Sequence, residues 1–136
     1  MTASTVAFKA VTPNLVVRDI ARSTRFYCDV LGFTVKQTVP DAAPFVFVWL
    51  KRGDVTVFLN DPAAVAKEVP SMAAREFGGT ATLFVTIDGV DALHAQVSPQ
   101  VPLAMPLTTQ FYGMREFAIF DPDGHLITFA ERVAAP

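Results

Sequence analysis

The chain has 136 residues, a hydrophobic content of 51%, eleven Lys and Arg, and thirteen Asp and Glu, which fits one domain with its own core, spanning residues 1–136. No apolar run approaches the roughly 18 residues that a membrane-spanning helix needs, and the first ten residues lack the pattern of a secretory signal, so we expect a cytoplasmic protein without a membrane partner. The formal charge of −2 and the lack of a basic cluster argue against nucleic acid as a partner.

The first half of the chain predicts one helix among four strands. An apolar run rich in β-branched residues ends at Arg18-Asp19, which suits a strand followed by a helix N-cap. Gly32 supplies the left-handed residue that ends many helices, Pro40 stops the next strand, and Arg52-Gly53-Asp54 is a hairpin turn. The expected elements are a strand at 11–17, a helix at 20–31 and strands at 33–39, 45–50 and 55–60.

A connector at 61–79 separates this half from a second one with the same order of elements. The connector is rich in Ala and opens on Asp-Pro, which favours a helix. Three prolines after the second-half helix restrict that stretch to an edge strand or a loop, and Asp121–Gly124 is a tight turn between the last two strands. The expected elements are a strand at 81–87, a helix at 90–97, an edge strand or loop around 99–106, and strands at 114–120 and 125–131.

The two halves repeat with a period of about 70 residues. Each half carries a threonine six or seven residues before the acid that starts its helix, and a glycine four residues before a position on its last strand. These landmarks pair Thr12 with Thr82, and Val57 with Thr128.

Three stretches form a recognisable series of motifs: Asn14–Asp19 with Ser23–Phe33, then Arg52–Val55, then Arg115–Gly124 followed by Phe129–Glu131. In this order they resemble the vicinal-oxygen-chelate superfamily, the glyoxalase, bleomycin resistance protein and dioxygenase family, and in particular its bleomycin-resistance-like branch. The resemblance implies an α+β fold of two βαβββ modules that form a curved mixed sheet around a cleft, usually in a homodimer. The modules would span about 8–60 and 80–132.

In the metal-dependent members of that superfamily, four inward-facing strand positions supply His, Glu or Gln to one divalent ion. The resemblance carries these positions onto Thr12, Val57, Thr82 and Thr128. A transition metal needs imidazole, carboxylate or thiolate donors, and no His, Asp, Glu or Cys lies within two residues of any of the four. We therefore expect no metal and no cofactor. The threonines either add hydroxyl groups to the cleft or are simply β-branched strand residues.

Aromatic residues are the other candidates for a ligand site. Phe45, Phe47 and Trp49 share one face of a strand, and that face either lines the cleft or packs under the helices. Tyr112 also has two alternatives. It contacts a ligand at the cleft mouth, or it is a turn residue whose hydroxyl lies in water. The predicted ligand-binding residues are Thr12, Asn14, Trp49, Val57, Thr82, Phe84, Phe111, Tyr112 and Thr128.

The titratable residues show no convincing catalytic group. We expect His94 and His125 to be solvated surface residues, because neither occupies an inward strand position. Cys28 is expected to be a packed thiol in its helix. Arg115 and Glu116 are expected to form a structural pair that fixes the last hairpin.

The leading hypothesis is a metal-free protein that sequesters a drug or metabolite in a dimer cleft, and so gives antibiotic resistance. One alternative is a metal-dependent enzyme, a glyoxalase-type lyase or isomerase, an extradiol dioxygenase or a fosfomycin thiol transferase. Another is an enzyme that uses Glu131, Glu116 or Tyr112 as acid–base groups without a metal. The sequence favours the binding protein and leaves open both the ligand and how the modules pair.

Overall fold

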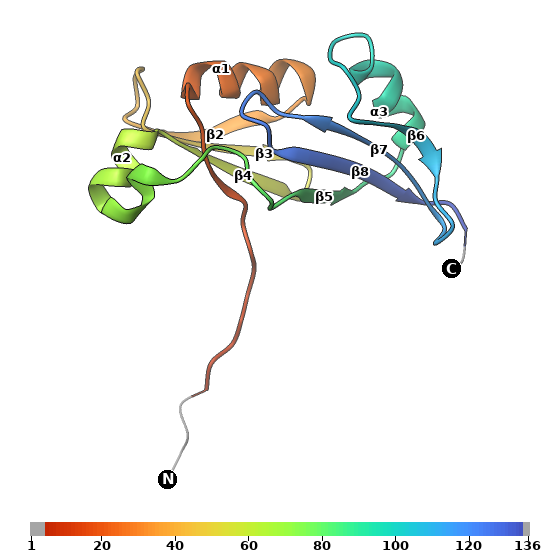
Figure 1. The fold of residues 1–136 in the computed structure, drawn as a ribbon, viewed down its shortest axis with the longest axis horizontal. Coiled ribbons are helices and arrows are strands. Elements are labelled where there is room, and N and C mark those ends of the chain that lie inside the picture. The colour runs from red at the N-terminus through yellow and green to blue at the C-terminus, as the bar shows by residue number, and fades with distance from the viewer. Residues whose placement is uncertain (1–4, 135–136) are drawn as a thin grey trace.

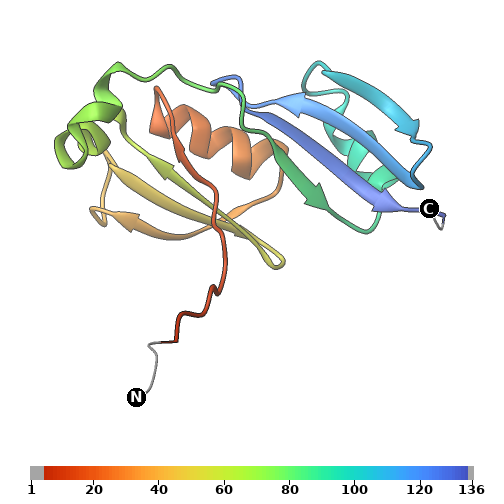
Figure 2. The ribbon, with the colours of Figure 1, turned by 60° about the horizontal axis from the view of Figure 1, so that its bottom comes forward.

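The computed structural model describes residues 5–134. It contains two four-stranded sheets that lie side by side along the long axis of the molecule (Figure 2), with helices α1 and α3 on the same side of them (Figure 1). The first sheet has the strands β1 (Asn14–Val16), β2 (Thr34–Val39), β3 (Phe47–Arg52) and β4 (Val55–Asn60), and the second has β5 (Leu83–Thr86), β6 (Met105–Thr109), β7 (Met114–Phe120) and β8 (Leu126–Arg132).

Both sheets have the same topology. Their strand orders are β1-β4-β3-β2 and β5-β8-β7-β6, and in each sheet the first strand pairs in parallel with the last while the other pairs are antiparallel. A helix follows the first strand of each sheet, α1 (Ile20–Arg25) or α3 (Val90–Val97). The expected α+β fold of two βαβββ modules is therefore confirmed.

The elements differ from the sequence-based expectation in four places. The edge strand β6 begins only at Met105, near the end of the expected stretch around 99–106. Both first strands are shorter than predicted, so that Thr12 and Thr82 precede β1 and β5. The first helix changes from α-helix to a π-helical turn at Phe26–Val30. The connector holds two short helices, α2 (Pro62–Glu68) and the 3₁₀ turn Pro70–Ala74, because a proline at position 70 has no N–H to continue the first of them.

The two main helices start in different ways. Asp19 caps α1 by accepting a hydrogen bond from the backbone N–H of Arg22 at 3.1 Å. Gly89 precedes α3 and has no side chain to offer, and the Val90 N–H donates instead to Glu131 Oε1 on β8, at 3.0 Å. The acid that caps α3 therefore lies 41 residues away along the chain, and it ties the helix to its own sheet.

One hydrophobic core runs through both modules on the helix-covered side of the sheets. Alternate residues of the strands point into it, and the fully buried ones contribute about 1.5–3 kcal/mol each. Members from the first module include Val48, Leu50, Val57 and Leu59, and members from the second include Phe117, Ile119, Ile127 and Phe129. The residues between them point to the opposite side of each sheet, which we call the open face.

Residues 5–13 extend away from the sheets (Figure 1), and the Phe8 side chain there is 98% exposed. Across residues 5–134, no helix has both the length and the apolar character that a membrane span requires.

Candidate functional site

The open face of the first sheet carries three aromatic rings. Trp49 on β3 lies directly opposite Phe58 on β4, with the ring centroids 5.9 Å apart and nearly perpendicular. Phe47 packs on the same Phe58 ring at 5.0 Å. All three side chains are only partly buried, whereas Val48 and Leu50 between them are fully buried on the other side. The question that the sequence left open is thereby answered for Phe47 and Trp49, which avoid the helix-covered face. Phe45 precedes β3 and packs against the core.

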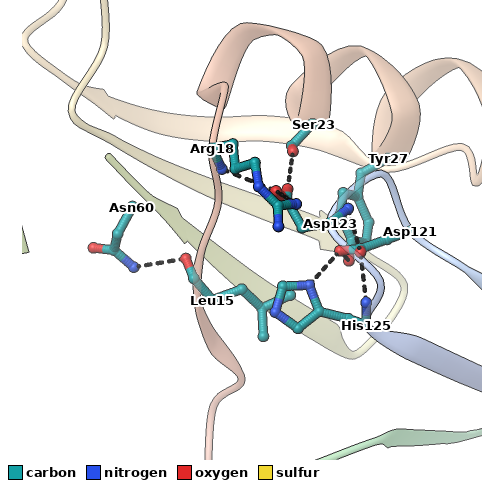
Figure 3. A network of polar contacts seen from close by, with 8 residues as sticks. All are labelled: Leu15, Arg18, Ser23, Tyr27, Asn60, Asp121, Asp123 and His125. Carbon is teal, nitrogen blue, oxygen red and sulfur yellow. Dashed lines mark hydrogen bonds and ion pairs between the residues drawn. The ribbon is translucent and has the colours of Figure 1, made fainter. Parts of the chain in front are cut away.

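Polar groups border this aromatic cluster. Asn60 on β4 donates from Nδ2 to Asn14 Oδ1 on β1 at 2.6 Å. Figure 3 shows its second hydrogen bond, to the Leu15 carbonyl at 3.3 Å. Within residues 5–134, the Trp49 Nε1 atom is buried and has no hydrogen-bond acceptor. The first open face thus offers an apolar surface of three rings bordered by a pair of amides, and it covers an indole N–H without an acceptor among residues 5–134.

On β4, the residue that faces the open side of the sheet is Phe58, not the expected Val57. In the second module Phe84 pairs with Thr128, and the corresponding pair in the first module is Asn14 with Phe58. Val57 is 2% exposed and belongs to the core. Gly53 and Gly124 each lie two residues before their strand, but the first strand residue faces the core in β4 (Val55) and the open face in β8 (Leu126). The glycine landmarks therefore miss by one residue. The sequence did contain a signal for Phe58. A two-residue turn at Gly53-Asp54 pairs Arg52 with Val55, and counting back along both strands from there pairs Trp49 with Phe58.

The open face of the second sheet is different in character. Phe84 on β5 is 57% exposed, and it pairs with Thr128 on β8, which in turn lies opposite Ala118 on β7. Glu116, the next inward residue of β7 on this face, lies opposite Ala130. Two alanines and an acid here occupy the places that the first sheet fills with larger or aromatic residues.

Glu116 and Tyr112 form a hydrogen-bonded pair at this face. The Tyr112 hydroxyl donates to Glu116 Oε1 at 2.6 Å, which raises the pKa of Tyr112, and the Phe111 ring packs edge-to-face on Tyr112. Glu116 is 4% exposed, and its Oε2 atom has no hydrogen-bond donor among residues 5–134. Two of the three acid–base candidates are therefore in contact, and the carboxylate keeps one unused oxygen.

Arg115 does not pair with Glu116, so that expectation was wrong. Consecutive strand residues point to opposite faces, and Arg115 reaches the helix side. There its Nε donates to Asp91 Oδ1 at 3.0 Å and its Nη1 to Thr109 Oγ1 at 3.2 Å. The third candidate, Glu131, is occupied as the cap of α3.

A groove separates the two modules. Its larger part has a volume of about 560 Å³ and its smaller part about 330 Å³, and both share a floor of apolar side chains that includes Phe33, Val55 and Phe129. Of the predicted ligand-binding residues, Val57, Thr82 and Phe84 border the smaller part. Thr12 lies between two residues that border it, Val11 and Pro13.

A buried polar network joins the two modules (Figure 3). The Tyr27 hydroxyl donates to Asp121 Oδ2 at 2.8 Å, and His125 Nδ1 lies 2.7 Å from the same oxygen. Asp123 accepts hydrogen bonds from the main chain and side chain of Arg18 and from Ser23. The β7–β8 turn is thereby attached to the start of α1 and to its π-helical turn, about 100 residues earlier in the chain.

His125 is buried rather than solvated, which corrects the sequence-based expectation. The hydrogen bond to Asp121 raises the pKa of His125 against the opposing effect of burial. Burial alone would raise the pKa of Asp121, but hydrogen bonds from His125 and Tyr27 hold it below its ordinary value. Burial and the Asp121 charge raise the pKa of Tyr27 far above its usual range. His94 is half-buried and packs edge-to-face on Phe117.

The residues present do not fit a transition metal. The positions that the resemblance assigns to a metal carry Thr12, Thr82 and Thr128, with Phe58 on the open face in place of Val57. Neither a hydroxyl nor a phenyl ring binds such an ion at neutral pH. No group of three or more His, Cys, Asp or Glu side chains within residues 5–134 is placed to hold one. Burial raises the pKa of the Cys28 thiol, which disfavours the thiolate needed of a ligand or nucleophile.

Known proteins resemble this chain over nearly its whole length. It is 30% identical to a bleomycin resistance protein of Geobacillus stearothermophilus, over 89% of this chain and 95% of that protein, and equally to one of Staphylococcus aureus. A protein of unknown function from Agrobacterium tumefaciens superposes with a TM-score of 0.77 at 29% identity, covering 93% and 96% of the two chains.

A bleomycin-binding protein from Streptomyces verticillus, solved with copper(II)-bleomycin, has the same fold, with a TM-score of 0.63 at 23% identity over 97% of this chain and all of that one. Residues 8–129 match the sequence profile of the Glyoxalase/Bleomycin resistance protein/Dioxygenase superfamily. The motifs, the two βαβββ modules and these relatives agree, and the chain belongs to that superfamily.

Proposed function

We propose that this protein binds a small organic molecule with a flat or bulky aromatic part, a drug or a metabolite, and sequesters it in the cytoplasm without a metal. The observation that carries the proposal is the cluster of Phe47, Trp49 and Phe58 on an open sheet face. Aromatic rings on the face away from α1 and α3 give a ligand a large contact area and well-defined stacking geometries. Relatives named as bleomycin resistance proteins support a drug as the ligand.

The cleft is proposed to be completed by a second copy of the chain. Each open face lies on the side of its sheet away from α1 and α3 (Figure 1), and apolar side chains on the second face, Phe84 and Phe120, are more than half exposed. A homodimer that brings the first open face of one chain against the second open face of the other buries both. The ligand would then lie between the three rings and the face that carries Thr128.

The rest of the predicted set is proposed to contribute at the edges of this cleft. Asn14 is held by Asn60 at the side of the aromatic cluster, and Tyr112 with Phe111 stands beside the second open face. Thr12 and Thr82 precede strands that flank the groove between the modules. Phe58 takes the place that the repeat assigned to Val57.

The proposal can be tested with copper(II)-bleomycin and a panel of aromatic drugs. Trp49 is the only tryptophan of the chain, so its fluorescence and its indole N–H resonance report on this face alone. We expect one or more compounds to change both signals, and Phe58→Ala to weaken binding about tenfold, since an aromatic contact contributes about 0.5–1.5 kcal/mol beyond its area.

Phe8→Ala is the matched control, because the Phe8 ring is almost fully exposed and lies outside the face. Sedimentation of the protein with and without ligand measures the dimer. A broad panel that leaves both Trp49 signals unchanged would contradict the proposed function, and a monomer that binds at full affinity would contradict the dimer cleft.

A further inference from the structure

The second open face holds a carboxylate with one oxygen left without a partner. Glu116 is almost completely buried, Tyr112 donates to its Oε1, and no donor among residues 5–134 reaches Oε2. Buried polar atoms in folded proteins are nearly always hydrogen-bonded, and an exception calls for a specific explanation. A carboxylate oxygen is a particularly demanding case, because the charge loses its water on burial.

The neighbouring side chains do not provide the missing donor. Arg115 points to the other face of the sheet and pairs with Asp91. Arg132 on β8 donates from Nη1 to the carbonyls of Tyr112 and Ala134, both at 3.4 Å. Across the ladder, Glu116 lies opposite Ala130, whose methyl group has no donor to offer.

Tyr112 fixes which oxygen stays available. Its short hydrogen bond holds Oε1, so the carboxylate cannot rotate freely to share its two oxygens among water molecules. The β7 alternation that sends Phe117 and Ile119 into the core sends Glu116 and Ala118 to the open face. Glu116 therefore belongs to the open face, where its Oε2 atom is shielded from solvent in the single chain.

Resting on the proposed function, we propose that Glu116 determines which ligands the cleft accepts, and that it favours aromatic molecules carrying an ammonium, amidinium or guanidinium group. A cationic donor supplies both the charge and the hydrogen bond that Oε2 lacks, and such bonds are about twice as strong as neutral ones. Tyr112 is the positioning residue of this carboxylate. The rings of Phe47, Trp49 and Phe58 hold the aromatic part, and Glu116 selects the charge.

Three naphthalene probes of the same shape test this selection: 1-naphthylmethylamine, which is cationic at pH 7, neutral 1-naphthylmethanol, and anionic 1-naphthoate. Each is titrated into the full-length protein labelled with ¹⁵N, and the single indole N–H resonance of Trp49 gives the Kd. We expect the amine to bind at least tenfold more tightly than the alcohol, and the naphthoate more weakly than either.

Glu116→Gln keeps the shape of the side chain and an acceptor for Tyr112 while removing the charge. We expect it to bring the Kd of the amine to within about twofold of the Kd of the alcohol, whose own Kd stays unchanged. Tyr112→Phe should reduce the preference for the amine only partly. Glu68→Gln is the matched control, because it removes the same charge from an exposed position on α2, and it should keep the full preference. Thermal unfolding of each variant checks that it is folded.

The outcomes separate this inference from the proposed function. If the alcohol binds and Glu116→Gln leaves the preference for the amine intact, or no preference exists, the role of Glu116 is overturned while the aromatic site stands. If the naphthalenes fail and copper(II)-bleomycin binds, Glu116→Gln must weaken that complex at least fivefold, and an unchanged Kd overturns the inference. If neither the probes nor the drug panel binds, the proposed function fails, and the role of Glu116 fails with it.

Discussion

The two modules share one order of elements and differ at the two places where that order leaves freedom, the hairpin turn and the open face. The first module has a turn of two exposed residues, Gly53 and Asp54, and an open face of aromatic rings. The second has a turn of five residues, Asp121 to His125, that is largely buried against α1, and an open face with Glu116 among small residues.

This difference shows which parts of a repeated module are constrained. Most helix-covered strand positions are apolar in both modules, because they build one common core. Turns and open faces contribute little to that core and are free to specialise. The first module uses its open face for aromatic contact, whereas the second uses its turn to attach itself to the first.

The largest expected effect concerns which residue of β4 faces the core. Val57→Glu should destabilise the protein by about 4 kcal/mol or more, because it places a charge without a partner in the core. Phe58→Glu should lower stability by about 1 kcal/mol, since its carboxylate stays on the open face. Urea unfolding of both variants measures the difference, and equal losses would show that the two faces of β4 have been assigned wrongly.

The next effect compares the two hairpin turns. Asp121→Ala should lower the free energy of unfolding by about 3 kcal/mol, because it leaves the Tyr27 hydroxyl, His125 and two main-chain N–H groups without their acceptor. Asp54→Ala, the same change in the exposed turn, should stay within about 0.5 kcal/mol of the parent protein. A similar small loss at both turns would mean that the network does not hold the modules together.

A smaller effect is expected from the caps of the two helices. Glu131→Ala should cost about 1 kcal/mol, comparable to Asp19→Ala, because each removes the acceptor at a helix N-terminus. Native-state hydrogen exchange should show faster exchange in α3 for the first variant and in α1 for the second. No change in α3 would indicate that Glu131 is available for another role, such as acid–base chemistry.

The smallest effect is the pH dependence of the network. The pKa of His125 is raised in the folded protein, so its stabilising contribution is complete below the unfolded value of about 6.5 and is lost as the pH rises through the folded pKa. The pKa of Asp121 is lowered, so its contribution is present above about 3.9 and is lost only in stronger acid.

We therefore expect the Tm of the parent protein to fall by a few degrees more between pH 6 and pH 8 than the Tm of His125→Gln. Differential scanning calorimetry at several pH values measures both. Parallel curves would show that His125 carries no titrating contribution to the attachment of the second module.

Much of the fold could be predicted from local patterns, and parts of the site could not. The apolar runs and the turn residues between them predicted the strands and their order along the chain. His125 was misjudged because a histidine after a turn is ordinarily solvated, and only the docking of that turn on Tyr27 buries it. Phe58 was missed because a glycine landmark does not reveal which face of the sheet the following strand residues meet.

The sequence by itself determined the order of the elements, the two modules and the lack of metal donors at the inward positions. These properties follow from residue types and short spacings, which are visible without contacts. Only the tertiary structure decided which strand face holds the rings, which oxygen of Glu116 stays without a partner, and how the Asp121 turn meets α1. Each of these depends on contacts across strands or between residues that lie far apart in the chain, and side-chain packing alone brings them together.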